Sequence, residues 1–202
     1  MSGAALRVGA RLSETTAEGP GPRYALWLQG CSIRCAGCCN PHLLDPLGGE
    51  ELEVAALLLE VRDAAASIEG VSVLGGEPFD QADGLLPFVR GVRELGLGVI
   101  VLTGFTREEL EAGGDPATRE VLAATDLLVD GPFQAECPET RRMWVGSSNQ
   151  RFHYLSGRYS PAVESGPGGR RVDHVEARID AAGAVRLNGW PFVAVGQPTR
   201  RP

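Results

Sequence analysis

The sequence predicts an α/β fold built on a parallel sheet, with a small β-hairpin added at the C-terminal end. Two observations predict the sheet. Short apolar runs, which indicate largely buried strands, occur at residues 24–29, 71–74, 97–102 and 127–129. Helical patterns lie between these runs, and strands that alternate with helices form parallel sheets. A third observation, a change of composition near residue 156, predicts the separate C-terminal part.

The helices are predicted by the spacing of apolar residues. Residues 51–65 place leucine and valine side chains among charged positions, and residues 85–95 repeat that pattern. Thr106, followed three residues later by Glu109, predicts a capping box at the start of a short helix. Residues 116–124 are expected to form a further helix. In such folds, ligands bind at the carboxyl ends of the parallel strands, so the loops after the strands are the place to look for function.

The C-terminal part differs from the rest. Residues 156–171 are rich in Gly, Ser and Pro, which predicts a linker or a long loop. Two extended segments, 174–180 and 184–188, follow it and flank Ala-Ala-Gly in the manner of a β-hairpin. We therefore divide the chain into a main domain over residues 1–155 and an extension over residues 156–202.

Composition excludes several classes of function. The net charge is −7, from 19 basic and 26 acidic residues, which argues against nucleic-acid binding. No apolar run reaches the roughly 18 residues that a membrane span needs, and the N-terminus lacks the pattern of a signal peptide. We expect a cytoplasmic protein that binds neither nucleic acid nor membrane.

The cysteines indicate a metal site. Four of the five lie within residues 31–39, as Cys31, Cys35, Cys38 and Cys39, and Cys137 stands alone. An odd, clustered set without a secretory signal argues against a disulfide framework.

The spacing C-x3-C-x2-C allows two kinds of metal site. Structural zinc needs four ligands, usually as two separated pairs. Cys39 adjoins Cys38, so only His42 and Cys137 remain as possible fourth ligands. A [4Fe–4S] cluster held by three thiolates keeps one iron without a protein ligand, and that iron can bind a substrate. The spacing favours the cluster, while zinc or unliganded thiols stay open as alternatives.

The motif Cys31-x3-Cys35-x2-Cys38 resembles the signature of the radical S-adenosylmethionine (SAM) superfamily. A second motif, Gly75-Gly76-Glu77-Pro78, follows a predicted strand and resembles the turn with which that superfamily binds the amino group of SAM. Paired glycines allow close approach of the backbone, and a carboxylate suits an ammonium group. The resemblance implies a cluster on Cys31, Cys35 and Cys38, and a SAM site formed by Gly37, Cys38, Cys39, Gly75, Gly76 and Glu77.

Further motifs resemble the activating proteins of glycyl-radical enzymes. Residues 18–23 are similar to their Gly-Pro-Gly-x-Arg entry, and residues 102–105 to their Thr-Gly-aromatic strand end. Residues 128–133 and 144–150 resemble most closely the anaerobic ribonucleoside-triphosphate reductase activating proteins. This resemblance implies a shortened, open (βα) partial barrel, with Thr103 and Asp130 lining its mouth. It implies either partner docking or loop architecture for Asn149 and Gln150.

The resemblance also implies a mechanism. A one-electron donor such as flavodoxin or ferredoxin would reduce the cluster, SAM would be cleaved, and the resulting radical would take a hydrogen atom from a glycine of a partner enzyme. That partner would be an anaerobic ribonucleotide reductase, and no catalytic acid or base is needed. Two alternatives are kept: a small radical SAM enzyme that modifies a peptide or small molecule, and a non-catalytic zinc or iron–sulfur interaction module.

Overall fold

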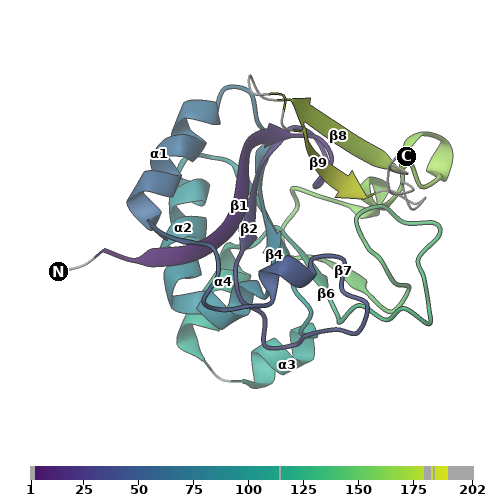
Figure 1. The fold of residues 1–202 in the computed structure, drawn as a ribbon, viewed down its shortest axis with the longest axis horizontal. Coiled ribbons are helices and arrows are strands. Elements are labelled where there is room, and N and C mark those ends of the chain that lie inside the picture. Colours follow the sequence, from purple (N-terminus) through teal and green to yellow (C-terminus); the bar gives the residue numbers. More distant parts are fainter. Residues whose placement is uncertain (1–2, 114, 180–182, 184, 191–202) are drawn as a thin grey trace, which may run out of the picture.

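The computed structural model describes residues 3–113, 115–179, 183 and 185–190. Over these residues the strands form a seven-stranded sheet in the order β3-β1-β2-β4-β5-β6-β7 and a separate two-stranded sheet, β8-β9. Figure 1 shows helices α1, α2 and α4 along one side of the large sheet, and β8 and β9 on the other side, beside the end of β1. Within the described part of the chain, no helix combines the length and apolarity that crossing a bilayer requires.

The centre of the large sheet is parallel, as the sequence predicts. Its strands are β2 (Arg23–Leu28), β4 (Gly70–Gly75), β5 (Gly98–Leu102) and β6 (Leu127–Asp130). Each predicted run lies within two residues of the observed strand. These strands are apolar almost throughout because both faces of the sheet are covered. On one face the helices complete the main core, and on the other Trp27 and Leu74 pack with Leu43 from a loop.

The edges of the sheet are antiparallel, so the predicted parallel arrangement holds for its centre and not for its edges. β1 (Ala5–Thr15) pairs with β2 and with β3 (Glu50–Glu53), and β7 (Arg151–Tyr154) pairs with β6, each in antiparallel register. The described strands form a mixed, open sheet, and closure into a barrel is not observed among them. The coarse expectation of an α/β protein with a parallel centre is confirmed.

The helices match the predicted ones with one exception. They are α1 (Val54–Ala64), α2 (Ala82–Glu94), α3 (Arg107–Ala112) and α4 (Pro116–Ala124). Residues 51–53 belong to β3 rather than to the predicted helix, because Leu52 pairs with Leu6 of β1. The predicted capping box is confirmed: the Thr106 hydroxyl accepts from Glu109 N, and the Glu109 carboxylate accepts from Thr106 N at 2.7 Å.

The C-terminal extension lies against the main sheet. Its first segment contains two 3-10 turns, η3 (Pro161–Glu164) and η4 (Pro167–Gly169). Tyr159 accepts a hydrogen bond of 2.8 Å from the buried Arg23, and Tyr154 of β7 donates one of 2.7 Å to Glu164. The predicted hairpin is confirmed as β8 (His174–Ile179) and β9 (Val185–Trp190). Its predicted ends at residues 180 and 184, and the chain after residue 190, lie outside the described residues.

Candidate iron–sulfur and cofactor site

The three spaced cysteines lie on one loop, residues 30–44, which we call the cluster loop. It follows β2 and ends in a 3-10 turn, η1 (Pro41–Leu43). Its base is closed by a backbone hydrogen bond of 2.8 Å from Gly30 N to Leu43 O. The Gln29 side chain adds bonds to His42 O at 3.2 Å and to Asp45 O at 2.7 Å. These bonds fix the base of the loop, and the cysteines lie in the part of the loop beyond them.

Cys31, Cys35 and Cys38 are half-buried and line a common cleft, as does the more exposed Cys39. All five thiols are free. Burial, together with nearby carboxylates, raises the pKa of Cys31. Burial of the Cys39 thiol, although the residue as a whole is exposed, raises its pKa to about 11.

The arrangement of these thiols bears on the choice between zinc and a cluster. In the part of the chain described here, no three His, Cys, Asp or Glu side chains are arranged to hold a single metal ion. A zinc ion needs its ligands to converge on one point, whereas each cysteine of a [4Fe–4S] cluster binds a different iron. Cys31, Cys35 and Cys38 come from one loop and line one cleft, which suits a cluster that keeps one iron without a protein ligand.

Residues 75–78, which we call the glycine turn, lie beside the base of the cluster loop. β2 and β4 run parallel with Leu28 opposite Gly75, so both loops leave the sheet at the same edge. Gly76 N donates to Leu28 O at 2.7 Å and Glu77 N donates to Gly30 O at 2.8 Å. A Cβ on Gly76 would lie 1.9 Å from Gly30 O. The glycine is thus required by contact between the two loops, in addition to any role toward a ligand.

Glu77 is fully buried at the bottom of this edge. Its carboxylate accepts hydrogen bonds from Phe79 N at 3.0 Å, from the Thr103 hydroxyl at 2.7 Å and from Gly104 N at 2.9 Å. Burial raises the pKa of Glu77 to about 7, although these three bonds oppose the shift. The sequence interpretation assigns this carboxylate to an ammonium group, whereas here it joins the end of β4 to the end of β5.

Two residues that the sequence reasoning did not single out bond to the cluster loop or to the residue just before it. The Asp80 carboxylate accepts from Ser32 N at 2.7 Å and from the Ser32 hydroxyl at 2.8 Å, directly beside Cys31. The Gln81 amide bonds to Arg7 N at 2.7 Å and to Gln29 O at 3.0 Å. Their place just after the glycine turn is the only signal in the sequence that could have drawn attention to them.

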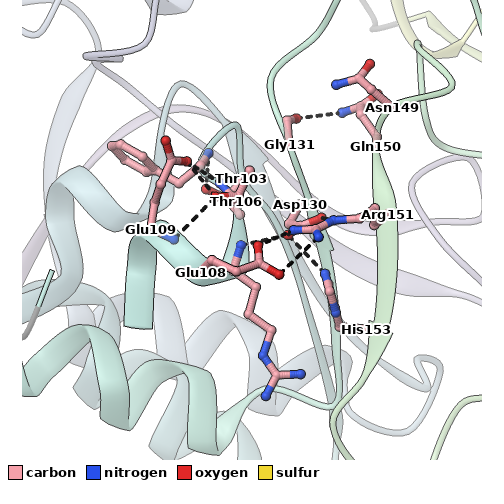
Figure 2. A network of polar contacts seen from close by, with 12 residues as sticks. Thr103, Thr106, Glu108, Glu109, Asp130, Gly131, Asn149, Gln150, Arg151 and His153 are labelled. Atoms are coloured by element: carbon pink, nitrogen blue, oxygen red, sulfur yellow. Dashed lines mark hydrogen bonds and ion pairs between the residues drawn. The ribbon is translucent and has the colours of Figure 1, made fainter. Parts of the chain in front are cut away.

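Asp130, at the end of β6, does not line the cleft. Figure 2 shows its carboxylate among Arg151, His153 and the start of α3. It accepts from Arg107 N at 2.7 Å and from Arg151 Nε at 3.0 Å, and His153 Nε2 lies 2.9 Å away. Burial would raise its pKa, but the hydrogen bonds from Arg151 and Arg107 N and the nearby His153 together outweigh burial, and the pKa is lowered. Asp130 therefore joins β6, β7 and α3, and the next residue, Gly131, lines the cleft.

Asn149 and Gln150 hold two loops together. Asn149 Nδ2 donates to Pro132 O at 2.7 Å, and Gln150 Nε2 donates to Gly131 O at 3.3 Å, a bond drawn in Figure 2. Gln150 Oε1 also accepts from Gly146 N at 2.8 Å. Of the two roles that the sequence left open, these contacts support loop architecture. Cys137 lies in the same region, its Sγ 3.5 Å from Asn149 Oδ1, and is not among the residues lining the cleft.

The cleft has a volume of ≈ 1130 Å³. Its walls come from the cluster loop, the glycine turn, Thr103, the loops around Phe133 and Trp144, and the β8–β9 hairpin. Sites for a single small molecule usually measure about 300–1,000 Å³. There is room here for a cofactor together with a short segment of a second molecule.

The cleft therefore fits the group that the cysteine spacing implies. Three thiols lie on one wall, and the glycine turn is locked to that wall by backbone bonds. The thiol chemistry suits an iron–sulfur cluster, and the remaining space adjoins the thiols.

Comparisons with known proteins agree with this geometry. A family model described as a 4Fe-4S single cluster domain matches residues 17–153. The anaerobic ribonucleoside-triphosphate reductase-activating protein of Pasteurella multocida is 32% identical over 140 residues, 66% of this chain and 87% of that protein. The protein of the same name from Escherichia coli K12 is 31% identical over 145 residues, 68% of this chain and 92% of that protein. The pyruvate formate-lyase 1-activating enzyme of E. coli K12 is 35% identical over 141 residues, 67% of this chain and 55% of that enzyme.

Proposed function

This chain belongs to the radical SAM family of glycyl-radical-enzyme activating proteins, and we propose from that premise that it generates a glycyl radical on an anaerobic ribonucleotide reductase. The single observation that carries the proposal is the cleft that three thiols of one loop line together with the glycine turn. Relatives matched over most of their length carry the name of this reductase's activator, which favours that partner over other glycyl-radical enzymes.

The cofactors supply the radical chemistry and the chain supplies position. When bound, a [4Fe–4S] cluster and SAM provide a one-electron cleavage that yields a 5′-deoxyadenosyl radical. Cys31, Cys35 and Cys38 would hold the cluster on a loop whose shape is set by the Gly30–Leu43 and Ser32–Asp80 bonds. Because only three thiols are used, a fourth coordination position is available to SAM.

The other predicted site residues would line the SAM-binding part of the cleft. Cys39, Gly75 and Gly76 lie along it, and Gly37 adjoins the Phe133 ring, which is itself part of the wall. Thr103 and Glu77 also line the cleft, but they bond to one another. We therefore assign the backbone of the glycine turn to the SAM amino group, and the Glu77 carboxylate to holding that backbone in place.

The chain itself needs no acid or base for a hydrogen-atom transfer. Its contribution is to orient the reacting groups and to exclude water, which would otherwise compete for a reactive intermediate. The reducing electron would come from an external one-electron donor protein such as flavodoxin or ferredoxin.

The proposal is tested in two stages on anaerobically reconstituted protein. Wild type should contain about four iron and four sulfide per chain and release 5′-deoxyadenosine when reduced with dithionite in the presence of SAM. Cys35→Ala should lose both properties, whereas Cys137→Ala and Cys39→Ala should keep them. One zinc per chain, with no 5′-deoxyadenosine, would instead establish a zinc module.

The second stage identifies the partner. The loaded protein is mixed with the anaerobic ribonucleotide reductase of the same organism, and the glycyl radical is measured by electron paramagnetic resonance. A radical that depends on SAM and on Cys35 supports the assignment. Release of 5′-deoxyadenosine without a radical on this reductase would retain the SAM chemistry and refute the partner.

A further inference from the structure

The β8–β9 hairpin carries an exposed apolar face. Ile179 pairs with Val185, and Ala177 pairs with Leu187, so their side chains share one side of the hairpin with Val175. The exposed fractions are 71% for Ile179, 61% for Leu187, 59% for Val185 and 41% for Val175. We call these five residues the hairpin apolar face.

Polar side chains on the opposite face of the hairpin, Glu176 and Asn188, bond to the last residue of β1 and to the residue after it. Glu176 Oε1 accepts from Thr16 N at 2.7 Å, and Asn188 Nδ2 donates to Thr15 Oγ1 at 2.9 Å. Gly189 N donates to Glu18 Oε1 at 2.9 Å. A hairpin that packs for its own stability turns its apolar face to the protein and its polar face to water. Here Glu176 and Asn188 bond to the protein, and the hairpin apolar face is the more exposed one among the described side chains.

The hairpin apolar face is continuous with the cleft that holds the cysteines. Leu187 belongs to both, and its neighbours Asn188 and Gly189 also line the cleft. Figure 1 shows the hairpin on the side of the sheet away from α1 and α2. The hairpin also lies beyond residues 17–153, the part that the family model matches. The hairpin apolar face therefore borders the cleft at Leu187.

The size of the face argues against a second copy of this chain as its occupant. A stable protein interface buries roughly 800 Å² on each partner. Four partly exposed aliphatic side chains and one alanine cover only part of that area. The face can add to an interface whose main contacts lie elsewhere, such as one centred on the cleft.

We propose that the hairpin apolar face is a docking surface for the partner enzyme, contacting apolar side chains next to the glycine segment that enters the cleft. This proposal rests on the proposed function. A carbon radical that is to persist in the partner must be shielded from water and oxygen, so its glycine comes from a buried segment, and buried segments carry apolar neighbours. When such a segment is presented to the cleft, those neighbours need an apolar surface, and this one borders the entrance.

The test uses the full-length, cluster-loaded protein and the anaerobic ribonucleotide reductase of the same organism. The variant is Ile179→Thr/Val185→Thr, which removes apolar surface from a cross-strand pair outside the cleft lining and keeps residues suited to strands. The control is Leu59→Gln, because Leu59 is 49% exposed on α1, on the other side of the molecule. Glycyl-radical formation is measured against reductase concentration, and 5′-deoxyadenosine is measured without reductase.

We expect the double variant to raise the KM for the reductase roughly tenfold, the effect of removing two interface side chains of ordinary weight. Its release of 5′-deoxyadenosine without reductase should equal that of wild type, and Leu59→Gln should change neither quantity. An unchanged KM would overturn the proposal.

If another molecule or segment covers the hairpin apolar face, the double variant gives a different result. If wild type is a dimer by light scattering and the double variant is a monomer, the face binds a second copy, and the proposal is wrong. If the variant has a clearly lower Tm at an unchanged KM, the chain covers this face itself, and the proposal is again wrong. Absence of 5′-deoxyadenosine from wild type would instead refute the proposed function.

Discussion

The substitution Gly76→Ala tests whether contact between the glycine turn and the cluster loop builds the site. A methyl group on Gly76 would lie 1.9 Å from Gly30 O and 2.7 Å from Gly30 C. Both atoms are backbone atoms, which cannot rotate away as a flexible side chain could. The two loops would have to separate at the point where the cluster loop begins.

The size of the effect follows from what that separation breaks. Two hydrogen bonds join the loops here, Gly76 N to Leu28 O at 2.7 Å and Glu77 N to Gly30 O at 2.8 Å. Each buried hydrogen bond contributes about 1 kcal/mol net, and forcing an extra methyl into a packed region costs about 1–3 kcal/mol. The sum, about 4 kcal/mol, is a large part of the 5–15 kcal/mol that stabilises a typical domain.

The assay is urea unfolding of the metal-free protein, followed by iron analysis after anaerobic reconstitution. The matched control is Gly157→Ala, because a Cβ on Gly157 meets no atom within 4 Å. That variant should stay within about 0.5 kcal/mol of wild type and bind a full complement of iron. If Gly76→Ala also unfolds within about 1 kcal/mol of wild type and binds iron fully, the contact does not build the site.

Three further predictions concern polar groups that stabilise the fold or the cluster loop. Arg23→Met should lower the free energy of urea unfolding by about 3 kcal/mol, because the acceptors Val71 O and Gly98 O lose their buried donor; a loss below about 1 kcal/mol would contradict this. Asp80→Asn should weaken the hold on Ser32 by about 1 kcal/mol, so that a chelator removes the cluster roughly fivefold faster; an unchanged rate would exclude that role. Burial alone would raise the pKa of Glu139. Hydrogen bonds from Arg141 N and Arg142 outweigh burial, so the net effect lowers that pKa from 4.5 to about 2. Because that pKa is depressed in the folded state, its contribution, about 1–2 kcal/mol once solvent screening is allowed for, is present above pH 4.5 and is lost as the pH falls toward 2. Urea unfolding should show Glu139→Gln to be less stable than wild type at pH 7, and the difference should close in acid; a difference independent of pH would refute it.

The sequence predicted the buried part of the fold better than its edges. β2, β4, β5 and β6 are continuous apolar runs, and such runs have few alternatives to a covered strand. β1 and β7 carry charged residues and are partly exposed, so neither shows a clear period. Residues 51–53, Glu-Leu-Glu, suit a helix locally, but pairing with β1 prevails, because backbone pairing at a sheet edge outweighs a weak local preference.

The candidate site was predicted to the extent that its residues are adjacent in sequence. Cys31, Cys35 and Cys38 share one loop, and that loop meets the glycine turn as expected. The supports were missed because their partners are remote: Asp80 bonds to a residue 48 positions away, and Gln81 to one 74 positions away. No local pattern encodes such pairs. For the same reason the sequence could not show that the Glu77 carboxylate already has three donors.

The two walls of the cleft are attached to the fold in different ways, and this has a consequence for how the protein can vary. The wall with the cysteines is joined to the glycine turn by backbone bonds, so a change there disturbs both loops. Among the described residues, the bonds between the hairpin and residues 14–18 each use a side chain, such as Glu176, Asn188 or Glu18. Side-chain bonds can be replaced one at a time without moving the sheet. The wall with the cysteines is therefore tied to the core of the fold, while the proposed docking surface on the hairpin can vary without disturbing that wall.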